Sequence, residues 1–173
     1  GFRVDTVKHV NTEFWQEFTP AVLDYARADD TDGLGTNGAG IPHFTMFGEV
    51  YSSDPGTLSY FTSEAKIPTV LDFGFQASIT STINANGVVD SGTTHPLTEL
   101  FNKDDMYNDT DSSASELLNF VGNHDMGRFA SFLGDTLDWE EKALGKVDLA
   151  HAAMYFSRGI PVIYYGAEQG FIG

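Results

Sequence analysis

The chain has 173 residues, 41% of them hydrophobic, which is enough apolar mass for one folded domain and excludes a disordered chain. Nine Lys and Arg against 25 Asp and Glu give a formal net charge of −16 at pH 7, a field that repels nucleic acid and anionic membranes. No Cys is present, which excludes disulfides and thiolate metal sites.

Short apolar runs bounded by Gly, Pro or Asp alternate with longer segments of helical periodicity. This alternation is typical of βα units whose strands form a parallel sheet. The pattern predicts five strands, at residues 2–5, 43–50, 68–73, 119–123 and 161–165. It predicts helices after the first strand and at about 56–65, 75–84, 95–107 and 146–158.

Three local features of the chain add to this pattern. Pro20 lies within the first helical segment and is expected to kink or split that helix, because proline removes a backbone donor. Trp15 in the same segment is expected to pack on the outside of the sheet rather than bind a ligand. Residues 29–42 are rich in Gly and Asx, so we expect a loop there.

The number of strands limits the architecture. A closed (β/α)8 barrel needs eight strands and about 250 residues, whereas five strands leave two unpaired edges on a hydrophobic sheet. We therefore expect an α/β fold that comprises the C-terminal five βα units of a (β/α)8 TIM barrel and is incomplete in this chain. Residues 1–173 would form one partial catalytic domain, and no apolar run is long enough to span a membrane.

Acidic side chains stand at the ends of three predicted strands. Residues two apart on a strand share a face, so Arg3 and Asp5 should point together into the barrel. A guanidinium favours the ionised carboxylate, which can attack as a nucleophile, although a simple strand-end ion pair explains the same residues.

Glu49 ends the second strand and Asp125, beside His124, follows the fourth. Taken singly, Glu49 could be an ordinary loop acid and Asp125 could cap an Asx turn. Barrel enzymes place catalytic groups at the carboxyl ends of their strands, however, and three acids there indicate one shared site. Tyr51, two residues past Glu49, could carry a sugar ring on its aromatic face or simply pack there.

Four segments carry a resemblance to a known family. Gly-Phe-Arg-Val-Asp-Thr-Val-Lys-His at 1–9, Gly-Glu-Val-Tyr at 48–51 and Phe-Val-Gly-Asn-His-Asp at 120–125 resemble, in order and spacing, signature segments of the α-amylase family, glycoside hydrolase family 13. Residues 159–169 resemble its eighth strand and the exit from it. The resemblance covers the whole chain, from the family's fourth strand to just past its eighth.

The resemblance implies a role for each acid. Asp5 matches the nucleophile, Glu49 the general acid and base, and Asp125 the acid that stabilises the distorted sugar. Arg3 and His124 match the side chains that contact these acids.

The resemblance also implies contacts beyond the reacting bond. Lys8 and His9 match a pair that contacts further glucose units, although a solvated pair at the start of a helix is the alternative. The His9 carbonyl matches a calcium ligand, so calcium is implied for the longer protein, with one backbone ligand at most in this chain.

The implied activity is that of a retaining glycoside hydrolase that cleaves internal α-1,4 bonds of starch-like glucans, outside the cell or in the periplasm. Two alternatives stay open. The first is an α-glucan transglycosylase such as a cyclodextrin glucanotransferase, which the same segments resemble. The second is a catalytically silent family member that binds glycans.

Overall fold

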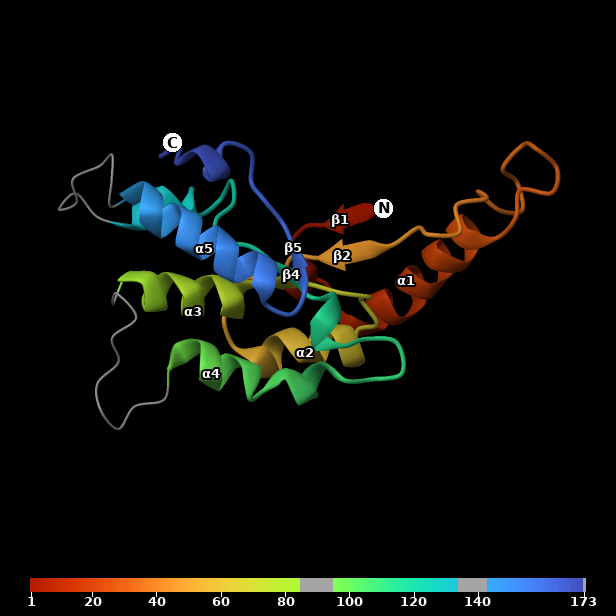
Figure 1. Ribbon diagram of the computed structural model, residues 1–173. Coiled ribbons are helices and arrows are strands. Elements are labelled where there is room, and N and C mark those ends of the chain that lie inside the picture. Colours follow the sequence, from red (N-terminus) through yellow and green to blue (C-terminus); the bar gives the residue numbers. More distant parts are fainter. Residues whose placement is uncertain (85–94, 134–142, 173) are drawn as a thin grey trace.

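The structure is a computed structural model that describes residues 1–84, 95–133 and 143–172 (Figure 1). Its strands are β1 (Phe2–Val4), β2 (Met46–Gly48), β3 (Leu71–Asp72), β4 (Leu118–Asn119) and β5 (Ile160–Pro161). Its α-helices are α1 (Thr12–Arg27), α2 (Pro55–Ser63), α3 (Phe73–Asn84), α4 (Pro96–Phe101) and α5 (Leu144–Phe156). Short 3-10 helices are η1 (Val7–His9), η2 (Asp104–Tyr107), η3 (Ala114–Glu116), η4 (Phe129–Leu133) and η6 (Ala167–Gln169).

The strands follow one another across a parallel sheet in chain order. β1 pairs with β2, and β3, β4 and β5 pair in sequence, all of them parallel. A parallel bridge between Gly48 and Val70 joins the two groups. Parallel neighbours connected through helices form the wall of a (β/α)8 barrel, so the predicted fold class is confirmed. In the described part of the chain, β1 and β5 are the outer strands of this wall.

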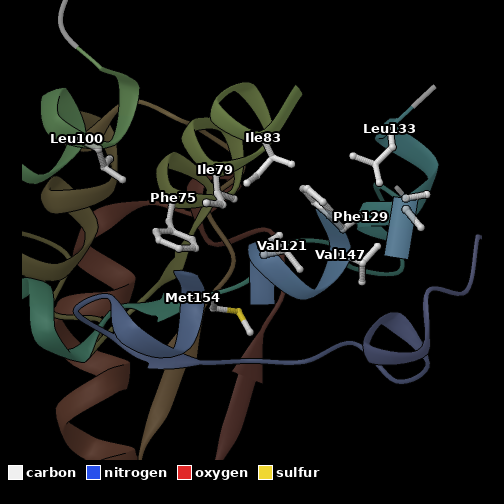
Figure 2. Close-up of a cluster of buried hydrophobic side chains, with 12 residues drawn as sticks. Phe75, Ile79, Ile83, Leu100, Val121, Phe129, Leu133, Val147 and Met154 are labelled. Atoms are coloured by element: carbon white, nitrogen blue, oxygen red, sulfur yellow. The ribbon is translucent and has the colours of Figure 1, made fainter. Parts of the chain in front are cut away.

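Apolar side chains pack on both faces of the wall. On the inner face Leu71, Phe73 and Phe120 form a buried cluster. On the outer face α3 contributes Phe75, Ile79 and Ile83, which recur every four residues and therefore share one side of the helix (Figure 2). These three side chains belong to one buried cluster with Val147 and Met154 of α5 and with Val121, which follows β4. Helix α3 is thereby packed against the sheet.

Helix α1 corrects one expectation. It runs without a break from Thr12 to Arg27 with Pro20 inside, so the predicted split is wrong. Buried residues on both sides of the proline hold the two halves to the sheet: Trp15 and Thr19 precede it and Ala26 follows it. The Trp15 indole also donates to the Val7 carbonyl at 3.0 Å, which confirms that this tryptophan packs in the core.

The strands are shorter than the apolar runs that predicted them. The strand predicted at 119–123 is observed at Leu118–Asn119, because the chain leaves the sheet there and residues 123–127 fold back into a turn. The helix predicted at 95–107 is interrupted, since the Lys103 N–H donates to the Leu100 carbonyl and tightens the chain into 3-10 geometry. Residues 29–42 form a loop, as predicted. No helix of the described residues is long and apolar enough to cross a bilayer.

A buried ion pair ties the sheet to its covering layer. Arg158, two residues before β5, donates to the fully buried Asp72 at 2.6 Å and to the Asn119 side chain at 3.1 Å. Asp72 and Asn119 are register partners on β3 and β4. The second oxygen of Asp72 accepts from the Phe75 N–H at 2.8 Å in the first turn of α3, and Asp104 accepts from the Arg158 Nε. One guanidinium thus joins three strands and η2.

Breaking this pair should destabilise the protein. Asp72→Asn in the full-length protein should lower the free energy of unfolding by about 3 kcal/mol, at the low end for a buried pair because Asp104 still contacts Arg158. Denaturant unfolding measures the loss. The matched control is Lys66→Met, which breaks the exposed Lys66–Asp109 pair and should leave the unfolding midpoint nearly unchanged. Equal effects of the two variants would contradict this account.

Candidate active site

The backbone places two carboxylates side by side at the carboxyl ends of β1 and β2. Val4 and Gly48 are register partners, and Asp5 and Glu49 are the residues that follow them. The Glu49 N–H donates to the Val4 carbonyl at 2.8 Å, and the Glu49 carbonyl accepts from the Val7 N–H at 3.1 Å. Parallel pairing therefore sets where both acids lie.

The third carboxylate, Asp125, lies on a tight turn beyond β4. Asn123 and Gly127 bond to each other through their backbones at 3.0 and 3.2 Å and close the turn. The Asn123 side-chain oxygen accepts from the Asp125 and Met126 N–H groups at 3.0 and 2.8 Å. The Asx cap of this turn is therefore Asn123, and the Asp125 side chain stays available to the site.

Glycines allow this turn to pack on itself. Gly127 has a φ of +91°, which favours glycine. A Cβ on Gly122 would lie 2.5 Å from the Gly127 carbonyl oxygen. Both positions therefore require glycine if Asp125 is to keep its place.

Arg3 connects the three acids. Its Nη2 lies 3.1 Å from Glu49 Oε2, 3.4 Å from Asp5 Oδ1 and 4.0 Å from Asp125 Oδ2. The prediction that Arg3 shares a face with Asp5 is confirmed. Its shortest contact, however, is a hydrogen bond to Glu49 from the neighbouring strand.

Glu49 differs from the other two acids in its environment. Its side chain is 12% exposed, compared with 64% for Asp5 and 53% for Asp125. Burial raises the pKa of Glu49, the neighbouring Asp5 and the charge of Asp125 raise it further, and Arg3 opposes the rise. Glu49 is thus the acid best suited to hold a proton, beside a more solvated Asp5.

The remaining predicted residues surround this cluster. His124 Nε2 lies 3.2 Å from Asp125 Oδ2. The Lys8 ammonium donates to the Tyr51 carbonyl at 2.8 Å and lies 5.8 Å from the centre of that ring. Tyr51 is 55% exposed and rests edge-on against Phe73, so one aromatic surface faces solvent beside the acids.

His9 stands apart from the acids. It ends η1, is exposed, and its imidazole makes no hydrogen bond within residues 1–84, 95–133 and 143–172. The same residues contain no cluster of three or more His, Asp or Glu that could hold a metal ion. One His9 carbonyl does not make a calcium site, so the donors described here do not fit calcium by themselves, and no reaction step is derived through it.

Sequence reasoning missed the role of two residues at the turn that carries Asp125. An Asx turn is one of the expectations for this signature segment, but the sequence does not tell that Asn123 is the residue that caps it. Arg128 is a charged residue that is only 7% exposed, and it follows the turn directly. A lone Arg at the start of the apolar run Phe-Ala-Ser-Phe-Leu was the one signal in the sequence that could have indicated it.

A parallel βα wall with carboxylates clustered at the carboxyl edge defines the chain as part of a (β/α)8 barrel of the catalytic type. The family description "Alpha amylase, catalytic domain" matches residues 1–173. The chain therefore belongs to the α-amylase family, glycoside hydrolase family 13, and the resemblance drawn from its signature segments is confirmed.

Individual relatives agree with this assignment. The chain is 39% identical to an α-amylase of Streptomyces lividans and 33% identical to a cyclomaltodextrin glucanotransferase of Geobacillus stearothermophilus, in both cases over its whole length. It spans 17% and 20% of those two proteins. The solved α-amylase of Geobacillus thermoleovorans, complexed with acarbose, superimposes with a TM-score of 0.73 at 25% identity, over 99% of this chain and 33% of that one.

The glycine requirement of the turn predicts an effect on turnover. Gly122→Ala in the full-length protein should shift the 123–127 turn, because the added Cβ meets backbone atoms that cannot rotate away. Displacing a catalytic group by about 1 Å costs on the order of 100-fold in rate, so kcat should fall by about that factor. Gly145→Ala is the control, since a Cβ there meets nothing within 4 Å. Wild-type turnover in Gly122→Ala would show that the turn tolerates the change.

Proposed function

We propose that the full-length protein is a retaining glycoside hydrolase that cleaves internal α-1,4-glucosidic bonds of starch-like glucans. The observation that carries this proposal is the cluster of Asp5, Glu49 and Asp125 around Arg3. Glu49 is the partly buried acid with the raised pKa, and Asp5 is the exposed carboxylate after the adjacent strand. A protonated acid beside an ionised carboxylate is the pair that a retaining glycosidase needs.

In the first step Asp5 attacks the anomeric carbon. The bond from that carbon to the glycosidic oxygen breaks while a bond to the Asp5 carboxylate forms, and the Glu49 proton passes to the leaving oxygen. In the second step the ionised Glu49 takes a proton from water. The water oxygen then bonds to the anomeric carbon, and Asp5 leaves as a carboxylate.

The neighbouring side chains support these steps. Arg3 contacts both Asp5 and Glu49 and offsets the repulsion among the acids. Asp125 and His124, 3.2 Å apart, stabilise positive charge on the sugar and bind its hydroxyls. The Tyr51 ring and the Lys8 ammonium bind glucose units beyond the reacting bond, with His9 next to them on η1.

The relatives support the choice of substrate. The S. lividans protein is an α-amylase, and the G. thermoleovorans α-amylase was solved with acarbose. We extend to this protein a starch-like glucan as substrate, an extracellular or periplasmic location, and a bound calcium whose ligands include the His9 carbonyl. The remaining calcium ligands would come from outside residues 1–173.

A second candidate function is transglycosylation. It is favoured by the 33% identity to a cyclomaltodextrin glucanotransferase over the whole chain. Chromatography of the products from soluble starch separates the two functions, because a hydrolase releases linear oligosaccharides and a cyclising transferase releases cyclic ones. Absence of both products would favour a silent, glycan-binding protein.

The stereochemistry of the earliest products tests the role of Asp5. A retaining pathway releases sugars whose new reducing end is first in the α configuration. Proton NMR of the full-length protein acting on maltooligosaccharides should show the α-anomer before mutarotation. An initial β-anomer would mean that water attacks directly and would refute Asp5 as nucleophile.

Loss of the third acid should slow the reaction without abolishing it. Asp125→Asn removes preorganised electrostatic stabilisation but leaves Asp5 and Glu49, so kcat should fall by roughly 10²- to 10⁴-fold. Reducing-sugar assays on starch measure the change. Glu17→Gln, an exposed acid on α1, is the control. Normal turnover in Asp125→Asn would remove Asp125 from the site.

The pH dependence of the same variant tests Glu49. The Asp125 charge is one of the causes that raise the pKa of Glu49, after burial and Asp5. A general acid works only while protonated, so the alkaline limb of kcat/KM follows this pKa. Asp125→Asn should lower the pKa and move that limb to lower pH, whereas Glu17→Gln should not. A limb that stays in place or moves to higher pH would contradict Glu49 as the acid.

A further inference from the structure

Arg128 is a buried cation whose place the proposed chemistry does not explain. Its residue is 7% exposed, and it follows the 123–127 turn directly. Within residues 1–84, 95–133 and 143–172 it forms no ion pair with a carboxylate. Burying a charge costs free energy unless other groups stabilise it. The groups that contact the Arg128 guanidinium therefore show which part of the chain it is bound to.

Those contacts come from the segment that follows β5. The Arg128 Nε and Nη2 both donate to the Tyr165 carbonyl, at 3.2 and 3.1 Å. The guanidinium also lies over three aromatic rings, 4.6 Å from Tyr164, 4.9 Å from Tyr165 and 5.9 Å from Phe171. Paired hydrogen bonds and cation–π contacts fix this segment against Arg128.

The backbone of Arg128 is fixed on the other side by the turn. Gly127, its neighbour, is held by the two backbone bonds to Asn123. The Arg128 carbonyl accepts from the Ser131 N–H at 2.9 Å and from the Ser131 hydroxyl at 2.6 Å in η4. The side chain therefore extends from an anchored position to the segment after β5.

The segment that Arg128 holds returns to the acids. The Tyr164 ring lies 6.4 Å from the His124 ring, centre to centre, and His124 contacts Asp125 at 3.2 Å. A continuous path of contacts thus runs from Arg128 through Tyr164 and His124 to Asp125. The side chains of His124 and Asp125 are about half exposed, so few neighbours fix their orientation. The contact of His124 with Tyr164 is one that does.

We propose that Arg128 is a positioning residue, which orients His124 and Asp125 by holding the Tyr164–Tyr165 segment against the turn after β4. It makes no contact with Asp5, Glu49 or Asp125 in the described residues and acts through Tyr164. This inference rests on the proposed function, because it concerns the orientation of Asp125 for catalysis.

The test uses the full-length protein with Arg128→Met and Arg128→Lys. Arg128→Met should lower kcat on starch by about 100-fold, the cost of misplacing a catalytic group by about 1 Å, with a smaller change in KM. Arg128→Lys should recover part of this loss, because an ammonium can still donate one hydrogen bond to the Tyr165 carbonyl and lie over the rings. The control is Arg27→Met. Arg27 is on α1, and it too donates to a backbone carbonyl, that of Phe44. Its kcat should stay at the wild-type value.

A double-mutant cycle separates positioning from general stability. If Arg128 acts through Asp125, Arg128→Met should cost little in an Asp125→Asn background, whereas a general effect on folding would multiply with it. Unchanged kcat in Arg128→Met, or fully multiplicative losses, would overturn the proposal. If Arg128→Met does not fold, the same cycle with Arg128→Lys decides the matter. A wild-type protein that acts on no α-glucan would overturn the proposed function instead.

Discussion

The contact of one guanidinium with three carboxylates is the constraint on which the site depends. Two like charges 4 Å apart at a protein surface repel by about 4 kcal/mol at an effective dielectric constant near 20. Arg3 offsets part of this repulsion through contacts of 3.1, 3.4 and 4.0 Å. Glu49 relieves the rest by favouring its protonated form, because its partial burial raises its pKa. This balance explains why Glu49, and not the more exposed Asp5, is the acid that holds a proton.

Three arginines hold three parts of the molecule together, each with a different chemistry. Arg158 pairs with the fully buried Asp72 and joins strands to the covering layer. Arg3 serves the acids at the carboxyl edge of the sheet. Arg128 uses a carbonyl and aromatic rings and links the segments that follow β4 and β5. The buried Arg158 pair therefore stabilises the sheet, whereas the charged acids lie at its carboxyl edge, where they are partly exposed to solvent.

Much of this arrangement could be predicted from the sequence, and the failures have physical causes. Period-two alternation placed Arg3 and Asp5 on one face, and parallel βα order placed Glu49 beside them. The preference of Arg3 for Glu49 depends on the register between strands, which no single segment encodes. Residues 119–123 are predicted as strand because Phe120 and Val121 are apolar, but the chain leaves the sheet after Asn119 and turns at 123–127, where Gly127 has a positive φ. Pro20 does not split α1, because the packing of buried residues on both sides of it outweighs the free-energy cost of a proline inside a helix.

The position of Arg3 on β1 also has a consequence for biosynthesis. The ribosome makes the chain from its N-terminus, and domains fold as units in that order. Arg3 and Asp5 emerge together, before Glu49 and long before Asp125. The counter-charge is therefore already present in the chain when each later carboxylate is made. A swap that moved the cation to β4 would leave Asp5 and Glu49 without a neighbouring cation until β4 had been made, so the order of charges along the chain favours assembly of the site.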